Sequence, residues 1–141
     1  MSGALESGQT APQHLFVYGT LRPGEVRWRH LAPFVDGDGH ADTAMGRLFD
    51  TGLGYPAAMF DGAADDAPVI GHTFHLAATT YEAAIERLDE VEGAVRGLYQ
   101  RVRIVTAAGL AAWAYQYGVD PTDAGIALTR IVGGDWLLRT G

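Results

Sequence analysis

Short apolar stretches alternate with polar and glycine-rich ones along most of the chain, which predicts many short strands and few helices. The segments between them are rich in glycine, proline and aspartate, as is typical of turns. The expected strands cover residues 14–18, 41–50, 57–60, 69–76, 99–106 and 110–118. The last two strands should pair as a hairpin, and the glycine-aspartate stretch at 36–39 is predicted to be a turn.

A helical pattern is clearest in TTYEAAIERLDEVEG, residues 79–93. Its apolar residues recur at helical spacing and form one stripe: Tyr81, Ala84, Ile85 and Leu88. Thr79 and Glu82 fit a capping box at its start, and Gly93 is expected to end it. A second, brief helix is expected in VRWRHLAPF, residues 26–34, where Pro33 would stop it.

The order of these elements predicts one α+β domain at residues 14–141, preceded by a flexible tail at residues 1–13. The connections between strands are too short for repeated crossover helices, so the sheet should be mostly antiparallel. A curled sheet or small barrel is compatible with so many short strands. In the final segment, residues 133–140, Asp135 is expected to cap a turn that returns Trp136 to the body of the domain.

Composition narrows the classes of function. The 141 residues carry a net charge of −7, which opposes nucleic-acid binding. No apolar run reaches the roughly 20 residues that span a bilayer, and the start of the chain lacks a signal peptide, so we expect a cytoplasmic protein without membrane contact. The sequence contains no cysteine, which removes disulfides, thiolate metal sites and a cysteine nucleophile. All ten basic residues are arginine, so no lysine can form a Schiff base.

Two common kinds of site do not fit the residues. Gly19 and Gly24 have the spacing of a phosphate-binding loop, but Glu25 follows where that loop needs lysine. The closest histidines, at positions 72 and 75, should point to opposite faces of a strand, so no metal site is expected. The only serines are in the predicted tail, so a serine nucleophile is not expected either.

Carboxylates are densest at the end of the long predicted helix, at Glu86, Asp89, Glu90 and Glu92. Taken alone, such a group usually forms a solvated helix face. Glu92, however, follows the apolar Val91 at the helix terminus, where its side chain could lean over the edge of the core. Loss of solvent there would raise its pKa towards that of a useful base.

The loop after the first strand offers complementary chemistry. Gly19 would let a ligand approach the backbone, and the consecutive N–H groups of Gly19, Thr20 and Leu21 could form a concave nest for an anion. An ordinary turn at the end of a strand is the alternative. A nest for a carboxylate together with a carboxylate base would suit a substrate that resembles an amino acid.

Several ordered motifs together resemble one known family. They are YGTLRPG, GRLFDTGLGYPA, GHTFHL, LDEVEG, WAYQY and GDWL, and they extend from His14 to Leu138. This set is similar to that of the gamma-glutamylcyclotransferase-like family, also called AIG2-like. The resemblance implies a small, bent, mostly antiparallel β-barrel with flanking helices around one cavity.

The resemblance also implies roles for particular residues. The glutamyl end of a substrate would be bound by the loop Tyr18, Gly19, Thr20 and Leu21. The catalytic acid/base would be Glu92 and not Glu90, because it directly precedes the glycine of LDEVEG. Tyr55, Pro56 and Tyr99 would form cavity walls, although Tyr99 could equally be a half-buried strand residue.

The implied reaction converts a small-molecule γ-glutamyl amine or γ-glutamyl peptide into 5-oxoproline and a free amine, with no cofactor and no metal. Two alternatives stay open: a non-catalytic small-molecule-binding module, and an enzyme that removes a γ-glutamyl group in one particular pathway. The sequence leaves the identity of the released amine and the oligomeric state undetermined.

Overall fold

The computed structural model describes residues 11–93, 99–118 and 128–138. The strands are β1 (His14–Val17), β2 (Val35–Asp50), β3 (Pro56–Met59), β4 (Ala67–Leu76), β5 (Tyr99–Val105), β6 (Ala111–Tyr117) and β7 (Thr129–Arg130). The helices are α1 (Trp28–Leu31) and α2 (Tyr81–Glu92), with single 3₁₀ turns at Ala32–Phe34, Ala78–Thr80 and Trp136–Leu138. Each strand expected from the sequence is present, with its ends moved by a few residues in most cases.

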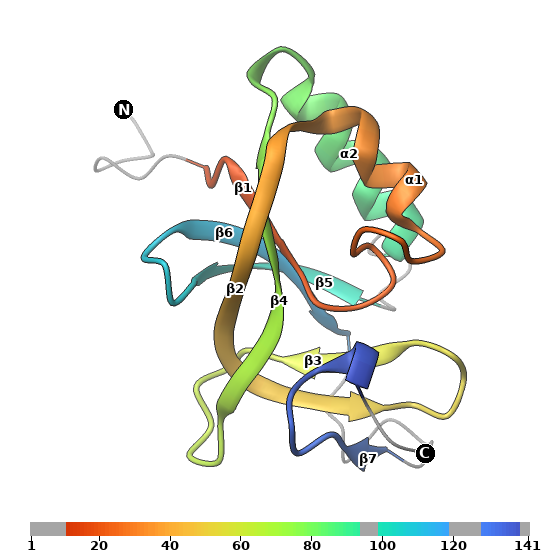
Figure 1. Cartoon of the computed structure of the whole chain (residues 1–141), viewed down its shortest axis with the longest axis vertical. Coiled ribbons are helices and arrows are strands. Elements are labelled where there is room, and N and C mark those ends of the chain that lie inside the picture. The colour runs from red at the N-terminus through yellow and green to blue at the C-terminus, as the bar shows by residue number, and fades with distance from the viewer. Residues whose placement is uncertain (1–10, 94–98, 119–127, 139–141) are drawn as a thin grey trace.

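The strands form one curled sheet in the order β3-β2-β4-β1-β6-β5 (Figure 1). β7 pairs with the last two residues of β2, Phe49 and Asp50. Neighbouring strands are antiparallel except for β1 and β6, which run parallel. The hairpin of β5 and β6 is present as expected. The α+β class and the mostly antiparallel, bent sheet are therefore confirmed.

β2 explains how the sheet bends. It pairs with β4 from Val35 to Gly46 and then with β3 from Arg47 to Asp50, so one long strand belongs to both halves of the fold (Figure 1). The prediction of a turn at residues 36–39 was wrong. Gly37 and Gly39 adopt positive φ angles of 90° and 66°, and the pairing register shifts there, so the stretch is an irregularity within β2.

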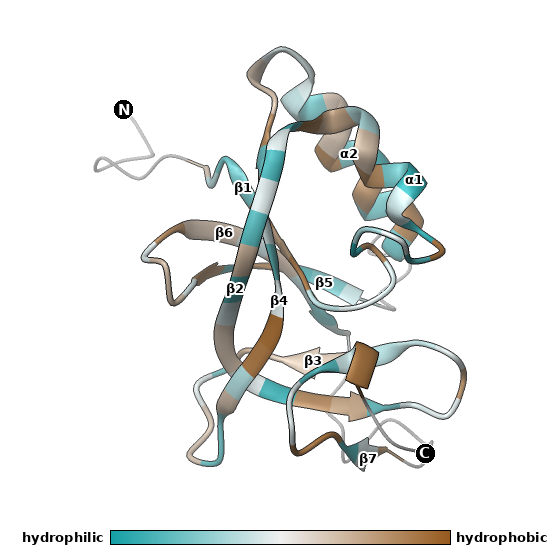
Figure 2. Ribbon diagram, in the orientation of Figure 1, coloured by the Kyte–Doolittle hydropathy of each residue, from teal (hydrophilic) through white to brown (hydrophobic). Residues whose placement is uncertain are grey.

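The long helix follows the predicted stripe, because Ala84 and Leu88 are fully buried in the core beside β1 and β4. Hydrophobic and hydrophilic positions lie next to each other along both helices (Figure 2). The capping box was wrong: Thr80 is the N-cap residue, it makes no side-chain cap hydrogen bond, and Ala78–Thr80 forms a 3₁₀ turn instead. Gly93 does end the helix, with a left-handed φ of 74°.

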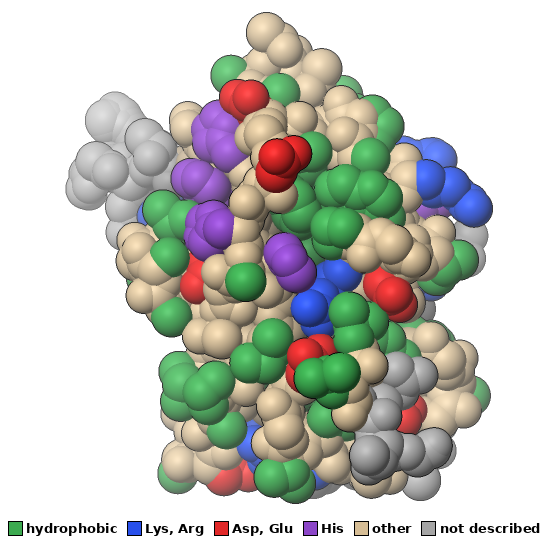
Figure 3. All heavy atoms as spheres, viewed as in Figure 1, with side chains coloured by type: hydrophobic (Ala, Val, Ile, Leu, Met, Phe, Trp, Pro, Cys, Tyr) green, Lys and Arg blue, Asp and Glu red, His purple; other side chains and the backbone are tan. Residues whose placement is uncertain are grey.

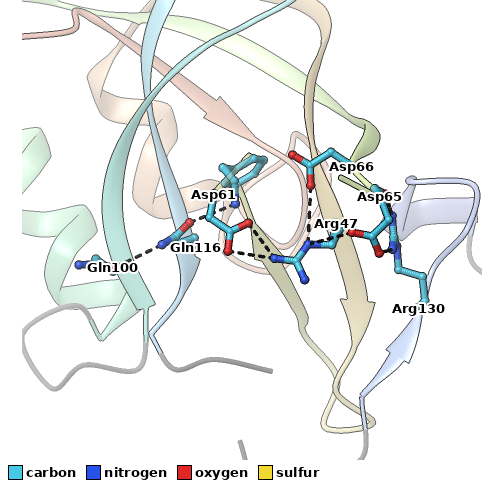
Figure 4. A network of polar contacts seen from close by, with 8 residues as sticks. Arg47, Asp61, Asp65, Asp66, Gln100, Gln116 and Arg130 are labelled. Atoms are coloured by element: carbon cyan, nitrogen blue, oxygen red, sulfur yellow. Dashed lines mark hydrogen bonds and ion pairs between the residues drawn. The ribbon is translucent and has the colours of Figure 1, made fainter. Parts of the chain in front are cut away.

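The acidic turn before β4 is held by arginines on two strands (Figure 4). Arg47 of β2 donates from Nη2 to Asp61 Oδ1 at 2.7 Å, and its Nε lies 3.6 Å from Asp66 Oδ1. Arg130 of β7 donates to Asp65 Oδ2 at 3.0 Å. The turn therefore links β7 to the part of β2 that pairs with β3.

Both ends of the described chain pack against the rest of the domain. Of the expected tail, residues 1–10 lie outside the described residues, while the carbonyls of Pro12 and Gln13 accept hydrogen bonds from Tyr81 and Leu76. Near the other end, Trp136 is buried in the core, and the Asp135 side chain accepts a bond from the N–H of Leu137.

Histidine side chains gather on one face, over the region of β1, β2 and β4 (Figure 3). The rings of His14 and His75 meet edge to face with centroids 5.1 Å apart. Within the residues that are described, none of the helices has the length and apolar character required to cross a membrane.

Candidate active site

The loop that follows β1 is anchored through its carbonyl groups. The N–H of Arg22 donates to the carbonyl of Gly19 at 3.0 Å, and the N–H of Arg27 donates to that of Thr20 at 2.8 Å. Within the described part of the chain, the N–H groups of Thr20 and Leu21 donate to no acceptor. The loop thus keeps donors available for a ligand while its own fold is fixed.

Gly19 is required here by close packing. A Cβ atom at this position would lie 2.6 Å from Cγ of Pro56, the first residue of β3. The backbone of the loop therefore rests directly on the start of β3. This contact brings the YGTL loop and the Tyr55-Pro56 segment together, although they are far apart in the sequence.

A small cavity opens beside this loop. It is lined by Phe16, Val17, Tyr18, Gly19, Thr20, Leu21, Arg27, Pro56, Glu92, Tyr99 and Tyr115. About 20 Å³ of it is accessible to the centre of a water molecule, which is space for roughly one water. Its lining comes from β1 and the loop after it, from β3, β5 and β6, and from the end of α2.

Glu92 reaches the cavity because it is the last residue of α2, where Gly93 ends the helix over the core. The residue is only 8% exposed. Burial raises the pKa of its carboxyl group above the ordinary value. Arg27 acts against this effect, because its Nη1 lies 3.1 Å from Glu92 Oε2 and favours the ionised form.

Three tyrosines enclose the carboxylate, and each phenol is already a hydrogen-bond donor. Tyr18 donates to the carbonyl of Tyr115, Tyr99 donates to the carbonyl of Pro56, and Tyr115 donates to Asp89 Oδ1 at 2.7 Å. Burial raises the pKa of all three phenols far above the ordinary value. They therefore stay protonated and neutral, and all three line the cavity together with Glu92.

Seven of the eight residues expected in the site line this cavity: Tyr18, Gly19, Thr20, Leu21, Pro56, Glu92 and Tyr99. Tyr55 is not in the lining, and it packs against Tyr99 with ring centroids 6.2 Å apart. Tyr99, the first residue of β5, is buried and lines the cavity.

The other carboxylates at the end of α2 do not enter the cavity. Glu86 and Glu90 are exposed, as expected for a solvated helix face. Asp89 forms a salt bridge with Arg101, whose Nε lies 2.8 Å from Asp89 Oδ1, and it also accepts the bond from Tyr115. Glu92 therefore differs from these carboxylates in being buried and in lining the cavity.

Arg27 and Tyr115 line the site but were missed from the sequence. The alternation of WAYQY indicates that Tyr115 faces inwards, and this signal could have identified it. No local pattern indicates Arg27, because its partner Glu92 is 65 positions away. Among the described residues, no group of three or more His, Asp or Glu side chains is placed to hold a metal ion.

Comparison with known proteins shows the family of this chain. A model of the gamma-glutamyl cyclotransferase, AIG2-like family matches residues 15–138. A gamma-L-glutamyl-butirosin B gamma-glutamyl cyclotransferase from Niallia circulans is 31% identical over 121 residues, covering 80% of this chain and 72% of that protein. The chain therefore belongs to the gamma-glutamyl cyclotransferase, AIG2-like family, as the motifs indicate.

Solved structures share the fold. YkqA from Bacillus subtilis has a TM-score of 0.62 at 27% identity, and the match covers 89% of this chain and 40% of that one. An AIG2-like protein from Mus musculus has a TM-score of 0.54 at 17% identity, covering 84% of this chain and 86% of that one. The second match, at this low identity, supports the fold alone.

Proposed function

We propose that this protein is a γ-glutamyl cyclotransferase that converts a γ-glutamyl amine or peptide into 5-oxoproline and a free amine. The observation that carries the proposal is the buried carboxylate of Glu92, which shares one cavity with the loop Tyr18–Leu21. Membership of the family supports the reaction class. The residue roles are those that the family resemblance implies, and the geometry of the cavity supports them.

The proposed reaction needs one proton carrier and a correctly folded substrate. Glu92 takes a proton from the substrate's α-ammonium, and the freed amine attacks the γ-amide carbonyl, forming a new C–N bond and a five-membered ring. The old amide C–N bond then breaks, and Glu92 returns the proton to the departing nitrogen; the ring nitrogen loses its second surplus proton to the released amine, which departs as an ammonium ion. Both reacting groups belong to one molecule, so holding them in the ring-forming conformation supplies much of the acceleration, with effective molarities of about 10⁵ M or more.

The surroundings of Glu92 suit this role. Burial raises the pKa of its carboxyl group, which makes its carboxylate a stronger base than one in water. The neighbouring phenols of Tyr99 and Tyr115 are neutral and committed to other acceptors, so they leave Glu92 as the proton carrier. The N–H groups of Thr20 and Leu21, which donate to no acceptor among the described residues, are available either for the substrate's carboxylate or for the oxyanion that forms during attack.

The test is release of 5-oxoproline from a panel of γ-glutamyl amides and peptides. Glu92→Gln keeps the shape of the side chain but cannot accept the proton, so kcat should fall by about 10²-fold to 10⁴-fold. Glu90→Gln is the matched control, because Glu90 is exposed on the same helix end, and its kcat should stay within about twofold. Equal activity of Glu92→Gln and wild type would disprove the proposed role of Glu92. Saturable binding of the panel without turnover would instead indicate a non-catalytic module.

A pathway-specific substrate is favoured by one observation. The relative from Niallia circulans is named as a γ-glutamyl cyclotransferase of gamma-L-glutamyl-butirosin B. The panel should therefore include γ-glutamyl conjugates of amines that are not amino acids. A kcat/KM at least about tenfold higher for one of these would favour removal of a γ-glutamyl group in a dedicated pathway.

A further inference from the structure

Arg27 brings the one positive charge found among the described residues that line the cavity. Its guanidinium forms a salt bridge with the one acid in that lining, since Nη1 lies 3.1 Å from Glu92 Oε2. In this structure the two charged groups of the cavity are therefore paired with each other. The glutamyl end of the proposed substrate carries the same two charges, an α-ammonium and an α-carboxylate.

The two partners differ in how freely they can move. The Glu92 side chain is 9% exposed, whereas that of Arg27, which also lines the cavity, is 33% exposed. The backbone N–H of Arg27 donates a hydrogen bond to the carbonyl of Thr20, so the Cα of Arg27 is held next to the loop Tyr18–Leu21. Its long side chain can swing while the loop stays in place.

The size of the cavity requires such a movement. The accessible space of about 20 Å³ holds roughly one water, which is too small for a glutamyl group. The aromatic residues of the remaining lining are all buried: Phe16, Tyr18, Tyr99 and Tyr115. Arg27 is the charged, partly exposed group whose displacement would open the site.

We propose that Arg27 selects substrates with a free α-carboxylate by exchanging its salt bridge with Glu92 for one with the substrate. This inference rests on the proposed function and deepens it. The guanidinium turns from Glu92 to the incoming carboxylate, and the α-ammonium takes its place beside Glu92. Each charge keeps an opposite partner throughout, so no buried charge is left alone.

The exchange also prepares Glu92 for proton transfer. Arg27 lowers the pKa of the Glu92 carboxyl group in the closed site, and its departure removes that influence. Among the described residues that line the cavity, the other titratable groups are the neutral phenols of Tyr18, Tyr99 and Tyr115, which supply no compensating charge. A substrate without an α-carboxylate would leave Arg27 on Glu92 and the base occupied.

The first test compares two substrates that differ at one group: a γ-glutamyl anilide and its α-carboxamide. Wild type should prefer the carboxylate by about 100-fold in kcat/KM, the range of a charged hydrogen-bonded pair. Arg27→Gln should reduce this preference to below about tenfold, and Arg27→Lys should retain part of it. Arg29→Gln, two residues away and exposed, is the control and should leave the preference unchanged.

The ratio separates selection from general damage. A structural effect of Arg27→Gln, or a changed pKa of Glu92, lowers activity on both substrates together and leaves their ratio intact. An unchanged ratio in Arg27→Gln would therefore overturn the inference. So would a wild type that accepts both substrates equally.

A binding experiment keeps the inference testable even without turnover. The ligand is N-phenylglutaramate, which has the carboxylate and the amide but no amine and cannot cyclise. Because Glu92 competes with its carboxylate for Arg27, calorimetry should show about tenfold tighter binding to Glu92→Gln than to wild type. Adding Arg27→Gln should abolish the gain, and equal affinities of Glu92→Gln and wild type would contradict the exchange. If the gain appears but no panel substrate yields 5-oxoproline, the proposed function fails while the role of Arg27 stands.

Discussion

At the scale of the residue, the decisive feature is an acid that the fold buries at a cost. Glu92 is 8% exposed, and burial outweighs Arg27 in setting the direction of its pKa, which is raised. The folded protein thus holds the proton of Glu92 more tightly than the unfolded chain does. The contribution of this group to stability is fully present below the ordinary pKa of 4.5 and is lost as pH rises through the raised value.

This argument predicts that Glu92→Gln stabilises the protein at neutral pH. The substitution removes a buried charge, and the freed Arg27 side chain is one third exposed and can reach water. We expect a gain of about 1 kcal/mol in the free energy of unfolding at pH 7, typical of relieving a destabilised functional site. The gain should shrink towards zero below about pH 4, where wild-type Glu92 is also neutral. Denaturant titrations at pH 4 and pH 7 measure it, and a loss of stability at pH 7 would contradict it.

Sequence reasoning could single out Glu92 for a physical reason, whereas it could not find its partner. A helix ending at Gly93 places residue 92 over the edge of the core, and this depends only on local pattern. Arg27 lies in a loop without periodicity, and its pairing depends on how α2 packs beside the loop after β1. Contacts of this kind are set by tertiary structure and leave no trace in neighbouring residues.

At the scale of the element, the end of α2 positions the proposed catalytic group. Gly93 has a φ of 74°, and its N–H donates to the carbonyls of Asp89 and Glu90, closing the last turn. A residue with a side chain is strained in this conformation by about 1 to 2 kcal/mol. The end of the helix and the direction of the Glu92 side chain therefore depend on the same glycine.

The resulting prediction concerns Gly93→Ala. It should lower the free energy of unfolding by about 1 kcal/mol and should also lower kcat, because relief of the strain rotates Glu92. Gly109→Ala is a matched control: its φ is 84°, it lies in the β5–β6 turn, and an added Cβ would meet no atom within 4 Å. It should cost similar stability and leave kcat unchanged. An equal effect of both variants on kcat, measured by 5-oxoproline release beside thermal melting, would refute the positioning role.

Element boundaries show where local pattern is insufficient. The glycines at 37 and 39 have the composition of a turn, yet β4 supplies hydrogen-bond partners on both sides, so the chain continues as β2 with an irregularity. The capping box at Thr79 and Glu82 failed because a 3₁₀ turn delays the start of α2 by one residue. The first difference comes from long-range pairing overriding a local preference.

At the scale of the whole molecule, the class of fold was predictable and the strand order was not. Strand lengths and short connections indicate an antiparallel sheet. The parallel pairing of β1 with β6, however, joins segments almost one hundred residues apart. That pairing brings β1 and its loop beside Tyr115, and the packing of Gly19 on Pro56 adds β3. The cavity is thus a product of topology, and only the family resemblance could anticipate it.

The C-terminal segment offers a test of this dependence. Arg22, which directly follows Leu21 of the substrate loop, forms a salt bridge with Asp135 at 2.8 Å, and their side chains are 8% and 15% exposed. Asp135 also accepts a hydrogen bond from the N–H of Leu137, and Trp136 packs into the core beside it. The segment after β7 therefore supports the loop from outside the cavity, without touching the cavity itself.

We predict that Asp135→Ala weakens both the fold and the site. It leaves the Arg22 guanidinium buried without its partner, which should cost about 3 kcal/mol in the free energy of unfolding. The loop after β1 should then shift, raising KM more than it lowers kcat, because Glu92 is on another element. Asp65→Ala is the control: it removes an ion pair with Arg130 in which the aspartate side chain is 68% exposed, and it should cost at most about 1 kcal/mol. A large loss of stability with an unchanged KM would contradict the positioning role. The salt bridge would then stabilise the fold without positioning the loop.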